Sequence, residues 1–292
     1  MREILISTES GSDLPPELIK RHDFHVVPMH VIIEDTDYAD GTIPVDMVFE
    51  HFERTGKVPS TSAVNVAEYQ EFWSKLQKEH PDCVIMHFTY SSLASSTHQA
   101  AMIAVRDFKD IYIIDTRQVS GGCTAHMVAS WKRIQEVKSA VTDYQALADE
   151  LQALADELQA LADKAVCHFV PNKLDYLKAG GRVSNAEYLG ATLLSLKPLI
   201  EMVDGKLIAT KKYHGPMKRW VDKFMDDFTQ KYNLRKDCLY LMYGKGLSEE
   251  VLKRMAENAK RLGFESYEYV MTGCVISCHG GKGAIGLAGM LE

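Results

Sequence analysis

The sequence lacks several features that would assign a chain to a class at once. Nowhere do about eighteen apolar residues follow one another without a charge, so no transmembrane helix is predicted. The first apolar run ends at Ile6 and follows an acid, Glu3, so we expect no export signal. With 33 basic against 40 acidic side chains the formal charge is −7, which disfavours nonspecific nucleic-acid binding. We therefore expect a cytoplasmic protein that does not span a membrane, although transient membrane contact stays open.

Motifs of common catalytic and metal sites are also missing. There is no Gly-x-Ser-x-Gly elbow, no Walker loop and no His-Glu-x-x-His. The six cysteines lie mostly in apolar stretches, which is typical of reduced core thiols in a reducing compartment. Cys274, Cys278 and His279 are near one another, but no second Cys/His pair stands at zinc-finger spacing. We interpret the two cysteines as buried strand residues and expect neither a metal nor another cofactor.

What the chain does contain is typical of a globular protein with two domains. Hydrophobic residues make up 46% of the 292 residues and charged residues 25%. This length is too great for one ordinary core and fits two. We expect a first domain over residues 1–165 and a second over 166–292, with a cleft between them.

In the first domain, apolar runs of strand length alternate with amphipathic stretches of helix length. Strands are expected at 4–6, 25–33, 83–88 and 111–115, and helices at 14–21, 44–54, from about 66, at 99–106 and at 123–137. Asn65 and Glu68 form a capping box before the third helix. Such alternation predicts an α/β fold with a mostly parallel sheet and helices on both faces.

A nearly exact repeat follows over 145–164, in which residues 145–151 and 152–158 are identical and a third partial copy begins at 159. The pattern predicts one long helix over 144–165, lengthened by whole heptads through natural duplication or engineering. An alternative is a coiled-coil contact that recruits a partner, although alanine occupies many of the candidate seam positions.

The second domain is predicted to be α/β with a mixed sheet. Asp204-Gly205 between two apolar runs is a strong hairpin signal, so an antiparallel element opens this domain. Helices are expected at 188–196, 217–232 and 248–262, and strands at 238–243 and 267–270, before a glycine-rich tail.

Hydroxyl-rich loops are expected where strands of the first domain end. They span residues 7–12, 60–62 and 91–97, and the second domain supplies His279 with the glycines after it. Open α/β sheets bind ligands beyond the carboxyl ends of their strands. Hydroxyls and free N–H groups there donate hydrogen bonds to an anion. Taken singly, Thr8, Ser60 and Ser96 are expected to be helix caps; together the loops favour an anion site.

A catalytic interpretation is the alternative for the same cleft. Ser95 and His279 could form a nucleophile and a base, but the sequence offers no third group to orient the histidine. A small-molecule kinase or hydrolase is therefore kept as the second hypothesis, and a binding protein that is not an enzyme as the first.

Five segments, in the same order, resemble the motifs of the DegV family of fatty-acid-binding proteins. They are residues 7–15, 59–62, 91–97, 177–183 and 279–286, where the family reads Thr-Asp-Ser-Thr-Ala-Asp-Leu, Pro-Thr-Thr-Ser, Ser-Ser-x-Leu-Ser-Gly-Thr, Leu-Lys-x-Gly-Gly-Arg-Ile and His-x-Gly-Pro-Gly-Ala-Leu-Gly. Each motif alone is weak, but the ordered set is specific. The chain departs from the family at 63–65, at Ser96 and at Lys282. These departures concern the geometry around the ligand's head group and the docking of a partner, rather than the fold.

The resemblance implies a ligand, a site and a partner. It implies that Thr61, Ser62, Ser95 and His279 hold the carboxylate of a long-chain fatty acid, whose tail lies in the second domain. Arg182 is either the end of a helix cap and turn or a residue for partner docking or carboxylate binding. The resemblance further implies that bacterial members present the acid to a fatty acid kinase, a separate protein that makes the acyl phosphate for phospholipid synthesis. The resemblance also implies that the fatty acid is a ligand and that the protein needs no cofactor.

Overall fold

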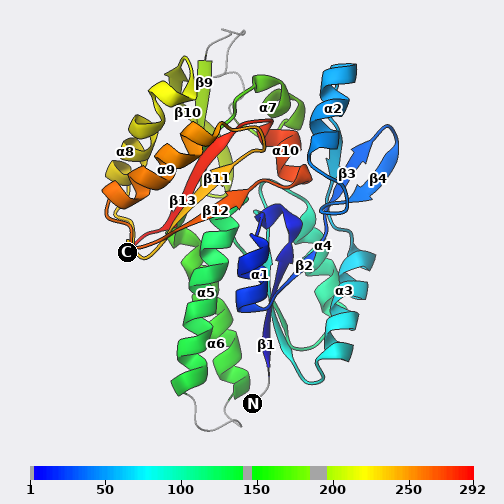
Figure 1. Cartoon of the computed structure of the whole chain (residues 1–292). Coiled ribbons are helices and arrows are strands. Elements are labelled where there is room, and N and C mark those ends of the chain that lie inside the picture. Colours follow the sequence, from blue (N-terminus) through cyan, green and yellow to red (C-terminus); the bar gives the residue numbers. More distant parts are fainter. Residues whose placement is uncertain (1–2, 141–146, 185–195) are drawn as a thin grey trace.

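The fold is described from a computed structural model of the chain, which defines residues 3–140, 147–184 and 196–292 (Figure 1). The predicted α/β class is confirmed: two main sheets are each covered by helices on both faces. The strands are β1 (Ile4–Glu9), β2 (Phe24–Val27), β3 (His30–Ile33), β4 (Thr36–Ala39), β5 (Ser60–Ser62), β6 (Val84–Thr89), β7 (Ile111–Asp115), β8 (Ala165–Val170), β9 (Leu196–Val203), β10 (Lys206–His214), β11 (Leu239–Tyr243), β12 (Tyr267–Met271) and β13 (Ile285–Met290). The helices are α1 (Pro16–His22), α2 (Asp46–Thr55), α3 (Val66–Glu79), α4 (Thr97–Ala104), α5 (Gly121–Ala140), α6 (Leu147–Ala160), α7 (Leu174–Gly180), α8 (Val221–Lys231), α9 (Glu249–Arg261) and α10 (Cys274–Gly280). In the described ranges no helix is long and apolar enough to cross a bilayer.

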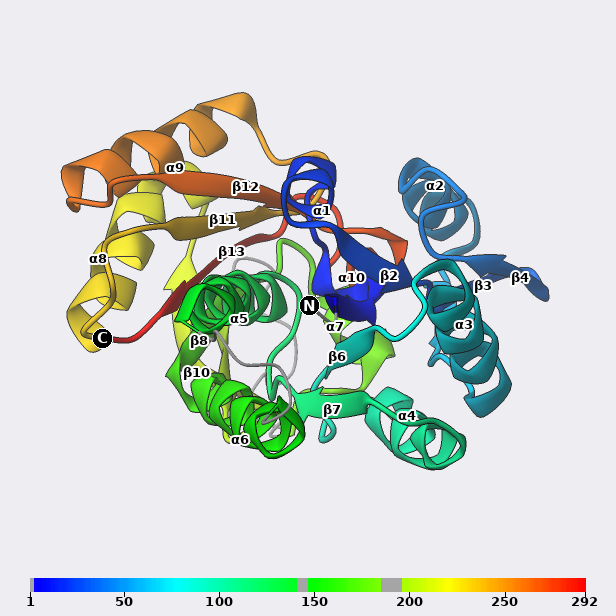
Figure 2. The ribbon, with the colours of Figure 1, turned by 90° about the horizontal axis from the view of Figure 1, so that it is seen from below.

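The first sheet has the order β2-β1-β6-β7, and all its strands are parallel, as the alternating pattern predicted. Apolar residues of α1, α5 and α6 cover one face and those of α3 and α4 the other. Figure 2 shows α5 and α6 on one side of this sheet and α3 and α4 on the opposite side. The parallel arrangement brings the loops after β1, β6 and β7 to one edge, where a ligand site was expected.

Two local predictions for this region were wrong. The expected strand over 25–33 is broken at Pro28, which has no N–H to continue a ladder. Its second half, β3, instead joins a small antiparallel sheet of order β4-β3-β5. Residues 60–62, predicted as a loop, are strand β5 of that sheet. The capping box of Asn65 and Glu68 at the start of α3 is confirmed.

The second sheet is mixed, with the order β10-β9-β8-β13-β11-β12. β9 and β10 form the predicted hairpin around Asp204-Gly205, and β11 pairs with β12 in parallel. Helices α8 and α9 cover its outer face, and α5 covers part of the inner face. Cys274 and Cys278, predicted to be strand residues, lie in α10 instead, because an apolar run this short fits either structure. All six cysteines are free.

The heptad repeat contributes to the core. α6 starts at Leu147 and gives way to a 3-10 turn at Leu161–Lys164, so the predicted helix ends slightly early, and residues 144–146 lie outside the described ranges. Leu151, Leu154 and Leu158 are buried against α5 and the first sheet. The predicted helix at 188–196 also falls on residues that are not described, except Leu196, which begins β9.

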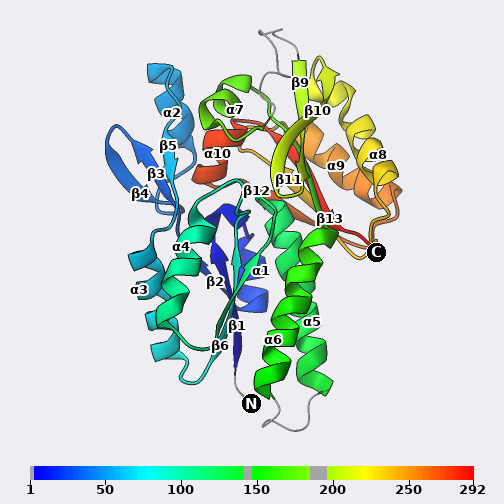
Figure 3. The ribbon, with the colours of Figure 1, turned by 180° about the vertical axis from the view of Figure 1, so that it is seen from behind.

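Helix α5 stands beside the first sheet, and one of its ends meets the second sheet (Figure 3). The ring of His126 contacts Phe88 of β6 in the first sheet, with 5.2 Å between ring centroids. At its start, Gly121 lies against Met242 of β11 in the second sheet. The two sheets therefore share one continuous apolar core through α5. A division near residue 165, where β8 begins, stays a proposal.

Candidate functional site

A cavity of about 270 Å³ opens where the first sheet's loops face the inner side of the second sheet. A buried water needs only ~10–15 Å³ of such space, so the cavity has the size of a small organic ligand. Its polar lining includes Thr61, Ser62, Ser95, Ser96, Ser120 and Thr272. Its apolar lining includes Val119, Phe169, Leu177, Leu207, Met242 and Ile285.

The two ends of this cavity differ in exposure. Ser62, Ser96 and Arg182 line it and are exposed, so they mark its mouth. Val119 and Met242 also line it, but they are almost completely buried. The exposed lining residues are therefore polar, whereas the buried lining residues are mostly apolar, apart from Ser120 and Thr272; this suits an amphiphile.

All five residues singled out from the sequence line this one cavity. Thr61 and Ser62 come from β5, and Ser95 comes from the loop between β6 and α4. His279 lies near the end of α10, and Arg182 follows α7. Residues from four separate segments of the chain thus meet at one place.

Nε2 of His279 and the Thr61 hydroxyl share a hydrogen bond, with 3.0 Å between nitrogen and oxygen. Burial, and to a lesser degree the positive charge of Arg182, lowers the pKa of His279 to about 4. The imidazole is therefore neutral at physiological pH. Its Nδ1 atom is buried without a hydrogen-bond partner and lies against Gly180.

The other hydroxyls of the mouth are also held locally. The Ser95 hydroxyl lies 2.9 Å from that of Thr97 and accepts a 3.2 Å hydrogen bond from the Thr97 N–H at the start of α4. The Ser62 hydroxyl has only a weak contact of 3.4 Å, to the carbonyl of Ala63, so it is available to a ligand.

The first hydroxyl-rich loop does not reach the cavity, and of the three expected helix caps only Ser96 stands at an N-cap position, before α4. Ser7 and Thr8 belong to β1 and are buried, and the Thr8 hydroxyl donates to the Phe88 carbonyl. Ser60 lies in β5, and Ser96 precedes α4 without a capping hydrogen bond. The hydroxyls at the cavity come from the other two segments and from Ser120 and Thr272.

The geometry does not favour the Ser95–His279 nucleophile and base. The hydrogen bond of His279 goes to Thr61, and that of Ser95 to Thr97. Among the residues that the structure describes, no third group orients Nδ1 of the histidine. Within the same residues, no three His, Cys, Asp or Glu side chains gather as metal ligands.

Two carboxylates hold α10, the helix that carries His279: Asp13 follows β1 of the first sheet, and Asp40 follows β4 of the small antiparallel sheet. Asp40 Oδ1 accepts from the N–H groups of Cys274 at 3.0 Å and Val275 at 3.4 Å. Asp13 accepts from the Gly273 N–H at 2.8 Å and from the Ser120 hydroxyl at 2.5 Å. Burial raises the pKa of Asp13 well above its usual value despite these hydrogen bonds. These contacts fix the position of His279 relative to Thr61.

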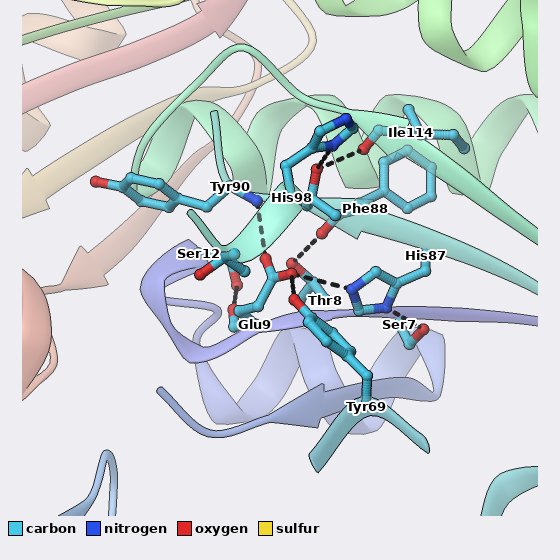
Figure 4. Close-up of polar contacts among 12 residues, drawn as sticks. Ser7, Thr8, Glu9, Ser12, Tyr69, His87, Phe88, Tyr90, His98 and Ile114 are labelled. Carbon is cyan, nitrogen blue, oxygen red and sulfur yellow. Dashed lines mark hydrogen bonds and ion pairs between the residues drawn. The ribbon is translucent and has the colours of Figure 1, made fainter. Parts of the chain in front are cut away.

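A second buried network supports the loop that follows β6 (Figure 4). Glu9 accepts hydrogen bonds from the Tyr69 hydroxyl, from His87 at 3.0 Å and from the Tyr90 N–H at 2.8 Å. Ser7 bonds to the other ring nitrogen of His87 at 2.8 Å. Serine, histidine and acid are aligned as in a hydrolase, but Ser7 and His87 are fully buried and no substrate reaches them. The network orients Tyr90, which lines the cavity.

Sequence reasoning missed several lining residues. Ser120 follows β7, a parallel strand whose end lies at the same edge as the others, so its position was a usable signal. Tyr90, Thr272 and the apolar residues of the second sheet carry no such signal. These residues line the cavity only because the two sheets face one another, which is a tertiary property.

Comparison with known proteins agrees with this architecture. The family described as "Uncharacterised protein, DegV family" matches residues 3–291. The chain is 30% identical over 297 residues to a DegV domain-containing protein of Caldanaerobacter subterraneus subsp. tengcongensis, with 98% of each covered. It is 25% identical over 299 residues to a protein of Thermotoga maritima named "Fatty acid-binding protein", covering 97% of this chain and 96% of that one. A solved structure described as "Fatty Acid Binding of a DegV family Protein from Thermus thermophilus" has a TM-score of 0.83 at 24% identity and covers 100% of both chains. With its full length matched and its fold shared, the chain belongs to the DegV family.

Proposed function

We propose that this protein binds a long-chain fatty acid, with the carboxylate at the cavity mouth and the acyl chain in the apolar depth. The observation that carries the proposal is one cavity whose exposed lining is polar and whose buried lining is mostly apolar. The name of the Thermotoga maritima relative and the description of the Thermus thermophilus structure support this ligand class.

The head group would be held by neutral donors. If Nε2 of neutral His279 carries the proton and donates to the Thr61 oxygen, the Thr61 hydroxyl is free to donate to the carboxylate. Ser62 and Ser95 would supply further donors, and Arg182 a positive charge at the mouth. Such donors offset the cost of desolvating the carboxylate, which is several kcal/mol when the group has no partners.

The acyl chain would supply most of the affinity. At about 0.8 kcal/mol per buried CH₂, a tail of around sixteen carbons contributes on the order of 12 kcal/mol before the costs of association. The polar end then fixes which end of the acid faces the mouth, and the apolar end gives the strength of binding.

We further propose that the protein performs no chemistry itself and presents the carboxylate to a separate fatty acid kinase for phospholipid synthesis. The exposed mouth supports this role, because Ser62, Ser96 and Arg182 lie where an approaching partner would meet the head group. The free cysteines support a reducing compartment, and thus a cytoplasmic location.

Titration of palmitate into purified, delipidated protein tests the binding proposal. Ser62→Ala, Ser95→Ala and Thr61→Val should each weaken binding by roughly 1–3 kcal/mol and leave the fold intact. Ser60→Ala is the matched control, because Ser60 is an exposed hydroxyl of the same strand that does not line the cavity. Native mass spectrometry should also reveal a fatty acid that copurifies and is lost on denaturation. Absence of both copurified acid and measurable binding would refute the proposal.

A further inference from the structure

The inner face of the second sheet forms the floor of the cavity. The strand register places Met242 of β11 opposite Gly286 of β13, and Gly286 opposite Phe169 of β8. Paired residues on neighbouring strands point to the same face of a sheet. These three residues therefore form one row across the floor, and all three line the cavity.

Gly286 leaves a trough in the middle of this row. A Cβ atom there would lie 2.8 Å from the His168 carbonyl oxygen and 3.2 Å from Cβ of Met242. The next residue of β13 on the same face is Ala288, which is also small. A narrow apolar path thus runs along β13 between the larger side chains of Met242 and Phe169.

The path ends where the side chain of Met242 crosses β13 toward Cys167 of β8. The next row, which includes Ala288 and Cys167, does not line the cavity, because the start of α5 covers it. A Cβ atom on Gly121 of α5 would lie 2.7 Å from Cγ of Met242 and 3.6 Å from Cβ of Ala288. The sulfur of Met242 lies 3.7 Å from that of Cys167. Met242 is only 3% exposed, and its side chain separates the cavity from α5.

We propose that Met242 is a specificity-determining residue that closes the deep end of the cavity and sets the length of acyl chain that fits. This inference rests on the proposed function, because it concerns the tail of the same ligand. With the carboxylate at the mouth, the terminal methyl group of the acid meets the thioether of Met242. Methionine suits this position because its unbranched side chain adapts to the end of a flexible ligand.

Affinities for a series of saturated acids, from about 12 to about 20 carbons, test the inference. Met242→Ala removes the end of the side chain, so acids about two carbons longer than the wild-type optimum should bind roughly tenfold more tightly than they bind to wild type. Met242→Val, which suits a strand, should move the optimum in the same direction and serves if the alanine variant is unstable.

Met255→Ala is the matched control. Met255 is a fully buried methionine of α9 on the outer side of the same sheet, so its truncation lowers stability without changing the cavity. Its chain-length profile should equal that of wild type. If wild type binds fatty acids and both Met242 variants keep its profile, the inference fails and the proposed function stands. If wild type binds no acid of the series, the proposed function itself fails.

Discussion

At the scale of single residues, the position of His279 depends on a glycine in another helix. A Cβ atom on Gly180, at the end of α7, would lie 2.3 Å from Nδ1 of His279. Real Cβ atoms do not approach a neighbour this closely, so any larger residue must displace the imidazole ring. The adjacent Gly181 adopts the left-handed conformation and ends α7, as predicted for a helix C-cap. The two glycines therefore have different roles: one ends the helix and the other makes room for the histidine.

Gly180→Ala should weaken fatty-acid binding by about 0.5–1.5 kcal/mol or more, because the displaced ring loses its hydrogen bond to Thr61. Ala179→Ser, at the exposed neighbouring position, is the control and should bind as wild type does. Both variants are measured by titration with palmitate and by thermal unfolding. Equal affinities for Gly180→Ala and wild type would mean that the His279–Thr61 contact does not contribute to the site.

Site residues could be predicted where they stand in a sequence motif, but not where their role depends on tertiary structure. Thr61, Ser62 and Ser95 stand in motif segments near strand ends, and the motifs indicated them even though β5 itself was mistaken for a loop. Met242 and Phe169 could not be found in this way. Their role depends on strand register and on which face of the second sheet meets α5, and both are tertiary properties.

At the scale of elements, α10 shows what local pattern could not determine. Its seven residues are too few for a helical period to be recognised, so two of its cysteines were interpreted as strand residues. The helix is stabilised from outside its own segment, since the Asp40 carboxylate accepts from the N–H groups at its start. That contact joins residues more than 230 positions apart.

Asp40→Ala should lower the free energy of unfolding by about 1–2 kcal/mol, because buried N–H groups at the start of α10 lose their acceptor. It should also weaken palmitate binding, since α10 carries His279. Asp40→Asn keeps an acceptor oxygen and should retain most of both properties. Urea unfolding and palmitate titration measure the two effects. If asparagine is as damaging as alanine, the negative charge of Asp40 matters more than the geometry of the cap.

At the scale of the whole molecule, the cavity lies between the two main sheets, and these sheets share one apolar core. Helix α5 contacts both main sheets, and its first ten residues are all buried. The alternation of strands and helices predicted the parallel sheet and the helices that cover it. It does not indicate that one helix packs against two sheets. Changes within α5 should therefore affect the stability of the whole chain.

His126 of α5 provides a test through pH. Burial lowers its pKa to about 4, and its Nε2–H group donates to the Leu158 carbonyl of α6 at 2.8 Å. The unfolded chain takes up a proton at this histidine below its ordinary value of 6.5, whereas the folded protein does not until about pH 4. Its contribution is therefore present above pH 6.5 and is lost as the pH falls toward 4. His126→Gln has no such titrating group. Between pH 7 and about pH 4.5 the free energy of unfolding should therefore fall in both proteins, but the fall should be about 2 kcal/mol smaller in the variant than in wild type. Other groups titrate in both proteins and cancel in the comparison. Urea unfolding at several pH values measures the difference, and parallel curves for the two proteins would show that His126 is not held neutral by the fold.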